Sequence, residues 1–128
     1  MNSVAYSPVL SKWVAVGYDY NALKSRILTS SDAATWGDLS SSGMFLNVNP
    51  FLVRWGGLAY VAVGSRTYPA TIGQELVSVD GASWRLVDPL LYMQLSGLCY
   101  SARSGRWVTC GYVVSTQPGV ATSLAFKP

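Results

Sequence analysis

Apolar residues in this chain occur in short runs of about four to six positions, separated by Gly, Pro, Ser and Asp. No segment repeats apolar residues at the i, i+3, i+4, i+7 spacing of an amphipathic helix. Short apolar runs bounded by turn residues are typical of β-strands. The pattern therefore predicts an all-β chain with strands at residues 4–6, 13–16, 26–30, 36–39, 52–55, 59–63, 75–78, 84–87, 98–101, 106–110 and 121–126.

A six-residue strand motif recurs at intervals of 47 residues. Its copies read KWVAVG, AYVAVG and RWVTCG, and they begin at Lys12, Ala59 and Arg106. A turn motif follows the first two copies, and its tryptophans, Trp36 and Trp84, lie 48 residues apart. Two independent motifs that share one period indicate an internal repeat.

Each full repeat holds four predicted strands, which is the size of one β-propeller blade. We therefore expect a single β-propeller-like domain over residues 1–128, with blade 1 over about 4–40, blade 2 over about 51–88 and a partial blade 3 over about 97–128. The predicted fold class is all-β: antiparallel four-stranded propeller blades, two complete and one partial, in an open or oligomer-completed β-propeller.

The turn motif has the form Ser-x-Asp-[Gly/Ala]-x-x-Trp. It resembles the Asp-box (BNR-type) repeat of sialidase-like and photosystem-assembly-factor-like β-propellers, and similar repeats occur in tail and fibre proteins of phages. Asp80-Gly81 matches this pattern well, whereas Asp32 is followed by Ala33, and the third repeat lacks the box. The resemblance implies a structural Asp-box made by Ser30, Asp32, Trp36, Ser78, Asp80 and Trp84.

The chemistry of the box favours a structural role. An Asp carboxylate in a turn accepts hydrogen bonds from backbone N–H groups of that turn, and Ser bonds locally beside it. The Trp ring is expected to pack between neighbouring sheets. The alternative is that Asp32 and Asp80 bind a metal or act as acids, but each is a lone carboxylate, whereas a hard cation requires several oxygen ligands.

Composition narrows the function classes. The net charge of +3 is too small to indicate a nucleic-acid partner or an anionic membrane surface. The chain has no His, which removes His-dependent catalysis and most zinc or copper sites. Its apolar runs are too short to span a bilayer, and residues 1–10 do not resemble a secretion signal. We expect no metal, cofactor, nucleic-acid or membrane partner; localisation is unknown, with a virion or the cytoplasm most compatible.

A sialidase-like mechanism would need an arginine cluster, a Tyr–Glu pair and an acidic Asp. The chain has a single Glu, Glu75, predicted at the start of a strand, and scattered Arg residues, of which only Arg66 falls in a loop on the expected ligand side. Asp19, Asp38 and Asp88 fall in separate loops or turns with no shared spacing, which does not support a paired-carboxylate glycosidase. The chain is therefore predicted not to be an enzyme.

The two cysteines flank a predicted hairpin turn. If Ser101 pairs with Arg106, Cys99 lies opposite Val108, and the thiols are diagonal neighbours about 7–8 Å apart at Cα. A disulfide usually needs a separation of about 4.4–6.8 Å. Cys110 also takes the place of core valines in the other repeats. We expect free, buried thiols.

Long loops are predicted on the side opposite the boxes, over residues 18–25, 65–74 and 112–120, joined there by the interblade segments 40–49 and 88–96. Loops longer than a hairpin needs often carry function. Exposed Tyr rings there suit sugars or a protein partner. The alternative is that these rings only pack their own loops. The candidate ligand-binding residues are Tyr18, Tyr20, Arg66, Tyr68, Tyr92 and Tyr112.

Fewer than three full blades leave open sheet faces and edges, which favour association with other chains. The chain is expected to complete its ring or an edge contact with copies of itself or with neighbouring structural proteins, unless the 128 residues are a fragment of a longer propeller. The predicted function is a non-catalytic structural or interaction module of a larger assembly, such as a phage virion or tail. The alternative is a carbohydrate-binding, lectin-like propeller that binds glycans; a glycosidase is the weakest reading.

Overall fold

The computed structural model describes residues 1–40, 48–66, 72–87, 93–112 and 123–124. The described residues are all-β, without a helix, and each predicted strand has a counterpart among them. The strands are β1 (Ser3–Ser7), β2 (Lys12–Asp19), β3 (Lys24–Ser30), β4 (Gly37–Asp38), β5 (Asn49–Trp55), β6 (Tyr60–Arg66), β7 (Ile72–Ser78), β8 (Arg85–Val87), β9 (Gln94–Ser101), β10 (Arg106–Tyr112) and β11 (Ser123–Leu124).

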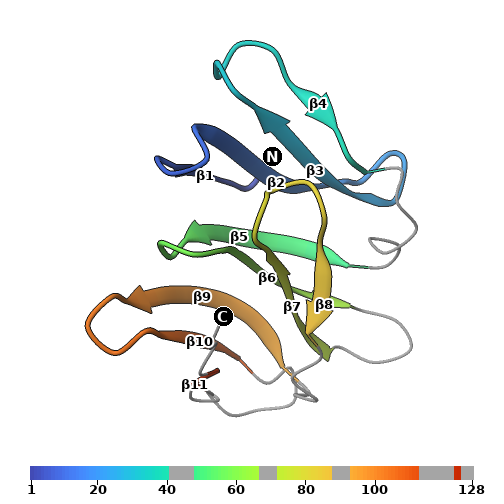
Figure 1. Cartoon of the computed structure of the whole chain (residues 1–128). Coiled ribbons are helices and arrows are strands. Elements are labelled where there is room, and N and C mark those ends of the chain that lie inside the picture. The colour runs from blue at the N-terminus through green and yellow to red at the C-terminus, as the bar shows by residue number, and fades with distance from the viewer. Residues whose placement is uncertain (41–47, 67–71, 88–92, 113–122, 125–128) are drawn as a thin grey trace.

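The strands form three antiparallel sheets in chain order. Sheet I contains β1-β2-β3-β4, sheet II contains β5-β6-β7-β8, and sheet III contains β9-β10-β11. Figure 1 shows the three sheets stacked one above another, with sheet II in the middle. The first strands of successive sheets lie side by side, since β1 contacts β5 and β5 contacts β9. Each repeat of the sequence is therefore one sheet of the stack.

The glycine that ends each strand motif allows two strands to approach closely. A Cβ atom on Gly64 would lie 2.1 Å from the carbonyl oxygen of Asn49, and one on Gly111 would lie 1.9 Å from that of Gln94. At Gly17 the same atom would lie 2.7 Å from Cα of Met1. In each repeat the chain at or just before the first strand thus runs so close to the end of the second strand that a side chain does not fit there.

Each sheet has two faces, because side chains alternate along a strand. We call the face of a sheet that points toward the preceding sheet in the chain its upstream face. The face that points toward the following sheet is its downstream face. In sheet II, Tyr60, Ala62 and Leu76 are upstream and pack on the downstream face of sheet I, which presents Val14 and Val16. All five side chains are at most 1% exposed.

A second core joins sheets II and III. The downstream face of sheet II contributes Val61, Val63 and Val77, and the upstream face of sheet III contributes Leu98 and Trp107. A Cβ atom on Gly56 would overlap the indole of Trp107, so this ring lies directly against the β5–β6 turn. The two cores use opposite faces of sheet II, which explains why both alternating sets of its side chains are apolar.

Each sheet carries a pair of aromatic rings on its upstream face. The ring centroids lie 4.6 Å apart in Tyr6–Trp13, 4.8 Å in Trp55–Tyr60 and 4.9 Å in Tyr100–Trp107. In each pair the two residues are directly opposed on the first and second strands of the sheet. The two paired rings are separated by four residues in sheet II but by six in sheets I and III, which hides this repeat from a fixed-period comparison of the sequence.

Candidate functional site

The two turns that carry the Ser-x-Asp-[Gly/Ala]-x-x-Trp motif, called box turns below, have the same hydrogen-bond pattern. Oδ1 of Asp32 accepts bonds from the backbone N–H groups of Ala34 and Thr35 at 2.9 and 2.7 Å, and from the Ser30 hydroxyl at 2.8 Å. In sheet II the corresponding bonds to Oδ1 of Asp80 measure 2.8, 2.7 and 3.0 Å, with donors Ala82, Ser83 and Ser78. Both carboxylates therefore accept hydrogen bonds from residues of their own turns, as expected for a local structural element.

These bonds stabilise the ionised carboxylates. Backbone N–H bonds from Thr35 and Ala34, with the Ser30 hydroxyl, hold the pKa of Asp32 well below its usual range. Burial raises the pKa of Asp80, but the bonds from Ser83, Ala82 and Ser78 together outweigh it and lower the pKa to about 2. A carboxyl group with so low a pKa does not donate a proton near neutral pH.

The two box tryptophans differ, contrary to the expectation that both pack between sheets. Trp84 is 5% exposed and belongs to the core between sheets I and II, where it lies beside Tyr60. Trp36 is only partly buried, and its Nε1 donates to the carbonyl oxygen of Ala33 within its own turn. The difference arises because Trp84 lies on a face covered by sheet I, whereas none of the three described sheets lies upstream of Trp36.

The box turn of sheet II also docks on sheet I. Nζ of Lys12 donates a 2.8 Å hydrogen bond to the backbone carbonyl of Asp80. The next residue, Gly81, has a φ of 73°, and a Cβ atom there would come within about 3.0–3.1 Å of Lys12, Tyr60 and Val14. The box turn of sheet II therefore has a second role, because it also holds sheet II against sheet I.

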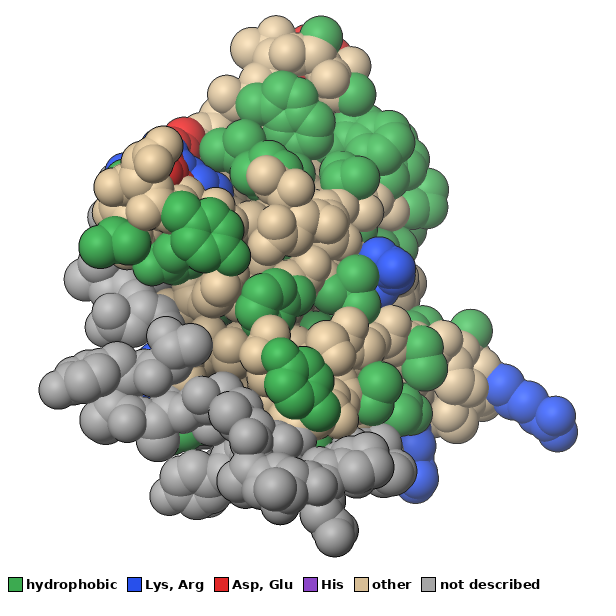
Figure 2. All heavy atoms as spheres, turned by 180° about the vertical axis from the view of Figure 1, so that it is seen from behind, with side chains coloured by type: hydrophobic (Ala, Val, Ile, Leu, Met, Phe, Trp, Pro, Cys, Tyr) green, Lys and Arg blue, Asp and Glu red, His purple; other side chains and the backbone are tan. Residues whose placement is uncertain are grey.

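Both ends of the stack expose the faces that are buried inside it. The upstream face of sheet I carries Val4 at 49% exposure and Tyr6 at 40%, with Trp13 partly buried beside them. The downstream face of sheet III exposes Val108 and the side chain of Arg106. Figure 2, a view of the back of the molecule, shows hydrophobic side chains gathered over sheet I at the top of the stack.

The cysteines lie on the downstream face of sheet III. The predicted register is confirmed, since Ser101 pairs with Arg106, Cys99 with Val108, and Cys110 with Gly97. Both thiols are free, as predicted, but the expectation that they are buried is wrong, because both are exposed. Cys110 does occupy the position of Val16 and Val63, but those two valines are covered by a following sheet, and Cys110 is not.

Of the predicted ligand-binding residues, the four that the structure describes lie at the end of the sheets opposite the boxes, and three of them are on strands. Tyr18, Arg66 and Tyr112 belong to β2, β6 and β10, because backbone pairing continues past the apolar runs through pairs such as Tyr18–Ser25 and Arg66–Ile72. The connections between β2 and β3 and between β6 and β7 are therefore shorter than predicted, whereas the one between β10 and β11 is not. Tyr68 and Tyr92 lie outside the described residues.

The described tyrosines at this end do not converge on one point. The rings of Tyr18 and Tyr20 meet edge to face with centroids 5.1 Å apart, and Tyr20 is 71% exposed. On sheet III, the Tyr112 hydroxyl donates to Oε1 of Gln94 at 2.6 Å. Nε of Arg66 is buried without a hydrogen-bond partner among the described residues. Among the described aromatic residues of this end, Tyr20 is the most exposed, and Tyr112 is 48% exposed.

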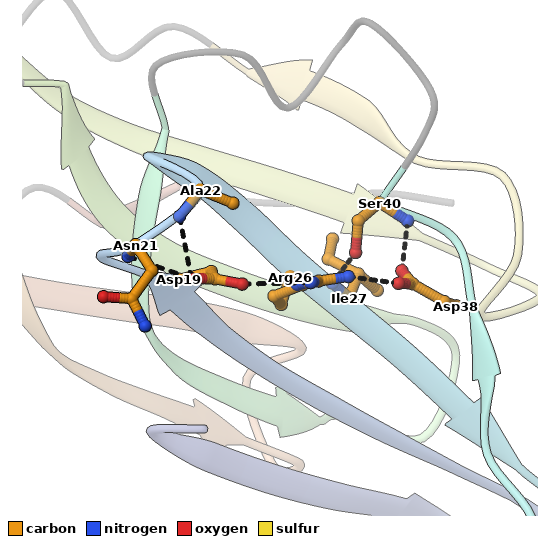
Figure 3. A network of polar contacts seen from close by, with 7 residues as sticks. All are labelled: Asp19, Asn21, Ala22, Arg26, Ile27, Asp38 and Ser40. Carbon is orange, nitrogen blue, oxygen red and sulfur yellow. Dashed lines mark hydrogen bonds and ion pairs between the residues drawn. The ribbon is translucent and has the colours of Figure 1, made fainter.

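A charged network that the sequence analysis missed crosses sheet I (Figure 3). Arg26 lies between two carboxylates, with Nη2 3.0 Å from Oδ2 of Asp19 and Nη1 in contact with Oδ2 of Asp38. Asp19 also accepts backbone bonds from Asn21 and Ala22. The residues are seven and twelve positions from Arg26, so only the pairing of β2, β3 and β4 brings them together.

The network is held in its charged form. The backbone bond from Ala22 and the bond from Arg26 lower the pKa of Asp19, and bonds from Ser40 lower that of Asp38. The bond to Asp19 raises the pKa of Arg26. Two ionised carboxylates that flank an arginine link three strands, but neither one can supply a proton as a glycosidase acid must.

Glu75 lies within β7 rather than at the start of a strand, and it is 2% exposed in the interface between sheets II and III. Burial raises the pKa of Glu75, although a hydrogen bond with Thr109 lowers it. Its Oε1 has no hydrogen-bond partner in the described part of the chain. The carboxyl is thus covered by two packed sheets rather than presented to a substrate.

Within the described ranges, no three His, Cys, Asp or Glu residues are grouped so as to hold a metal ion. No helix of the described residues is long and apolar enough to cross a membrane. The chain matches no protein-family model, no curated protein and no solved structure.

Proposed function

We propose that this protein is a non-catalytic structural module that joins a larger assembly through the two end faces of its sheet stack. In this proposal the sheets are propeller blades with Asp-box turns, two complete and one partial, and another chain supplies the missing neighbours. Propellers close with about four to eight blades, so three sheets leave two open sides.

One observation carries the proposal: equivalent positions are buried inside the stack and exposed at its ends. Val14 and Val61 are 0% and 2% exposed where another sheet follows, whereas Val108 is 36% exposed where none does. Tyr60 and Trp107 are likewise 0% and 4% exposed, while Trp13 in the same position is only partly buried. Exposed apolar sheet faces of this kind favour association with another chain.

The titratable groups support a non-catalytic role. The pKa values of Asp19, Asp32, Asp38 and Asp80 are lowered by bonds within their own turns and strands, and Glu75 is enclosed between sheets. The resemblance of the turns to Asp-box repeats, which occur in phage tail and fibre proteins, makes a virion or tail component our preferred setting, with the cytoplasm as the other.

Sedimentation velocity over a range of micromolar concentrations tests this proposal. The wild-type chain is expected to sediment as an oligomer, and Val108→Glu should lower its mass because a charge would be buried at the contact. Val9→Glu is the matched control, since Val9 is 74% exposed in the β1–β2 turn, away from both end faces. A cooperatively folded wild-type monomer at every concentration would contradict the proposal.

A second candidate function, glycan binding, is favoured by the Tyr18–Tyr20 pair. Tyr20 presents an open ring at the end of the sheets opposite the boxes, and such rings stack on sugars. A glycan array with the wild type and Tyr20→Ala tests it, with Leu23→Ala as the control because Leu23 is equally exposed in the same hairpin. Binding that is lost only in Tyr20→Ala supports this function, and no binding by the wild type excludes it for the glycans tested.

A further inference from the structure

We infer that the partner at the end faces is a second copy of this chain, docked head to tail, with the downstream face of sheet III on the upstream face of sheet I of the next copy. The inference rests on the proposed function and goes beyond it by naming the partner and its orientation. Three features of the structure carry it.

The first feature is the match between the two open faces and an interface already present in the chain. Sheet I presents Val14 to the ring of Tyr60 in the next sheet, and both belong to one core. Sheet III presents Val108 in the position of Val14, and sheet I presents Trp13 in the position of Tyr60. The contact between copies would therefore place Val108 against Trp13 as Val14 is placed against Tyr60 between sheets I and II, with Cys110 in the position of Val16.

The second feature is the aromatic pair. Trp55–Tyr60 and Tyr100–Trp107 each place one fully buried ring against the preceding sheet. Tyr6–Trp13 has the same arrangement, with ring centroids 4.6 Å apart, but no sheet in the described part of the chain covers it. Aromatic rings fixed in this way bury much apolar surface at little cost in side-chain entropy, as at the centres of interfaces.

The third feature decides the orientation. A cation begins the motif strand in sheets I and III, as Lys12 and Arg106, whereas sheet II has Ala59 there. Lys12 binds the Asp80 carbonyl in the box turn of the sheet that follows it. Ala59, in the same position before sheet III, has no side-chain donor and cannot form such a bond. Arg106, which has the position of Lys12, is therefore placed to donate a hydrogen bond to the box turn of a sheet that follows sheet III.

Sheet I of a second copy is such a sheet. In the head-to-tail contact, the Arg106 guanidinium would donate to the Asp32 carbonyl of the next copy, as Lys12 does to Asp80 within one chain. Packing two sheet III faces, or two sheet I faces, against each other would bring no box turn to Arg106. The distribution of these cations thus favours a heterologous contact, which forms a ring if the rotation closes and a filament if it does not.

Two single-face variants test the orientation. Val4→Glu places a charge on the upstream face of sheet I, and Val108→Glu places one on the downstream face of sheet III. Each variant alone is expected to be monomeric by sedimentation velocity. Their equimolar mixture is expected to form dimers of twice the monomer mass, because each mixed pair keeps one intact contact. Circular dichroism checks folding, and Arg106→Glu replaces Val108→Glu if the latter does not fold.

The possible outcomes are distinct. If Val108→Glu alone still dimerises, the contact joins two sheet I faces, and if Val4→Glu alone does, it joins two sheet III faces. Either result overturns the head-to-tail arrangement and leaves the proposed function standing. If both variants and their mixture keep the wild-type mass, the end faces are not the contact and both proposals fail. Monomers in the mixture of two folded variants also overturn the head-to-tail arrangement.

Discussion

Nζ of Lys12 donates a 2.8 Å hydrogen bond to the carbonyl oxygen of Asp80, which lies 68 residues further along the chain. The bond joins the beginning of the motif strand in sheet I to the box turn of sheet II. The hydroxyl of Tyr60 donates to the carbonyl oxygen of Lys12, so the same residue is bound through both its side chain and its backbone. A local turn motif therefore stabilises the contact between repeats as well as its own loop.

Lys12→Met removes the donor and keeps an apolar stem of similar length. We expect a loss of about 1–2 kcal/mol in the free energy of unfolding, because the bond involves a charged donor and is partly buried. Urea denaturation followed by tryptophan fluorescence measures it. Lys24→Met is the comparison on β3, and an equal loss in both variants would show that the Asp80 contact contributes nothing specific.

Asp80→Asn should destabilise the protein at neutral pH by about 1–3 kcal/mol, because it replaces charge-assisted hydrogen bonds with neutral ones. The pKa of Asp80 is about 2 in the folded state and 3.8 in its unperturbed state. A carboxyl with a lowered pKa contributes stability above the unfolded pKa, and that contribution disappears as the pH falls from about 4 to about 2.

The melting temperature measured against pH checks this expectation. The difference between the wild type and Asp80→Asn should be largest above pH 4 and should shrink toward pH 2. Asp32 titrates in the same acidic range, so some pH dependence will remain in the variant. A difference that does not change over this range would show that the charge of Asp80 does not stabilise the turn.

Ala33→Gly should raise the melting temperature. Ala33 has a φ of 60°, in the left-handed region where a Cβ atom is unfavourable, and the equivalent residue of the other box is Gly81 at 73°. Relief of this strain is expected to add about 0.5–1 kcal/mol to the free energy of unfolding. Ala34→Gly is the matched control and should be neutral or destabilising. Equal effects in both variants would refute the strain at Ala33.

Glu75→Gln should stabilise the protein most at alkaline pH. Burial raises the pKa of Glu75 above its unfolded value, so stability from the protonated form is full below the unfolded pKa and is lost as the pH rises through the folded pKa. A neutral Gln has no such loss. The melting temperatures of the wild type and of Glu75→Gln, measured from pH 4 to pH 9, should differ more as the pH rises. A constant difference would show that the pKa of Glu75 is not raised in the folded state.

The aromatic pairs and the charged network are cross-strand contacts, which the spacing of residues along the sequence does not reveal. Tyr6, Trp55 and Tyr100 are equivalent, but unequal hairpins shift them out of a constant period. In the sequence, Asp19 and Asp38 fall in separate loops or turns, but the antiparallel pairing of the strands brings both carboxylates to Arg26. Cross-strand contacts depend on register, and register depends on turn lengths as well as on apolar spacing.

The sequence by itself determined the local structure: the strands, the period of the repeat, the pairing of Ser101 with Arg106 and the self-contained box turns. Each follows from alternation, turn chemistry or short-range hydrogen bonds, which a few neighbouring residues decide. Only the tertiary structure decided which repeats bury their equivalent residues. Trp84 is buried and Trp36 is not, and Val63 is covered while Cys110 is exposed. The reason is physical: alternation determines the face to which a side chain points, but burial requires another sheet against that face.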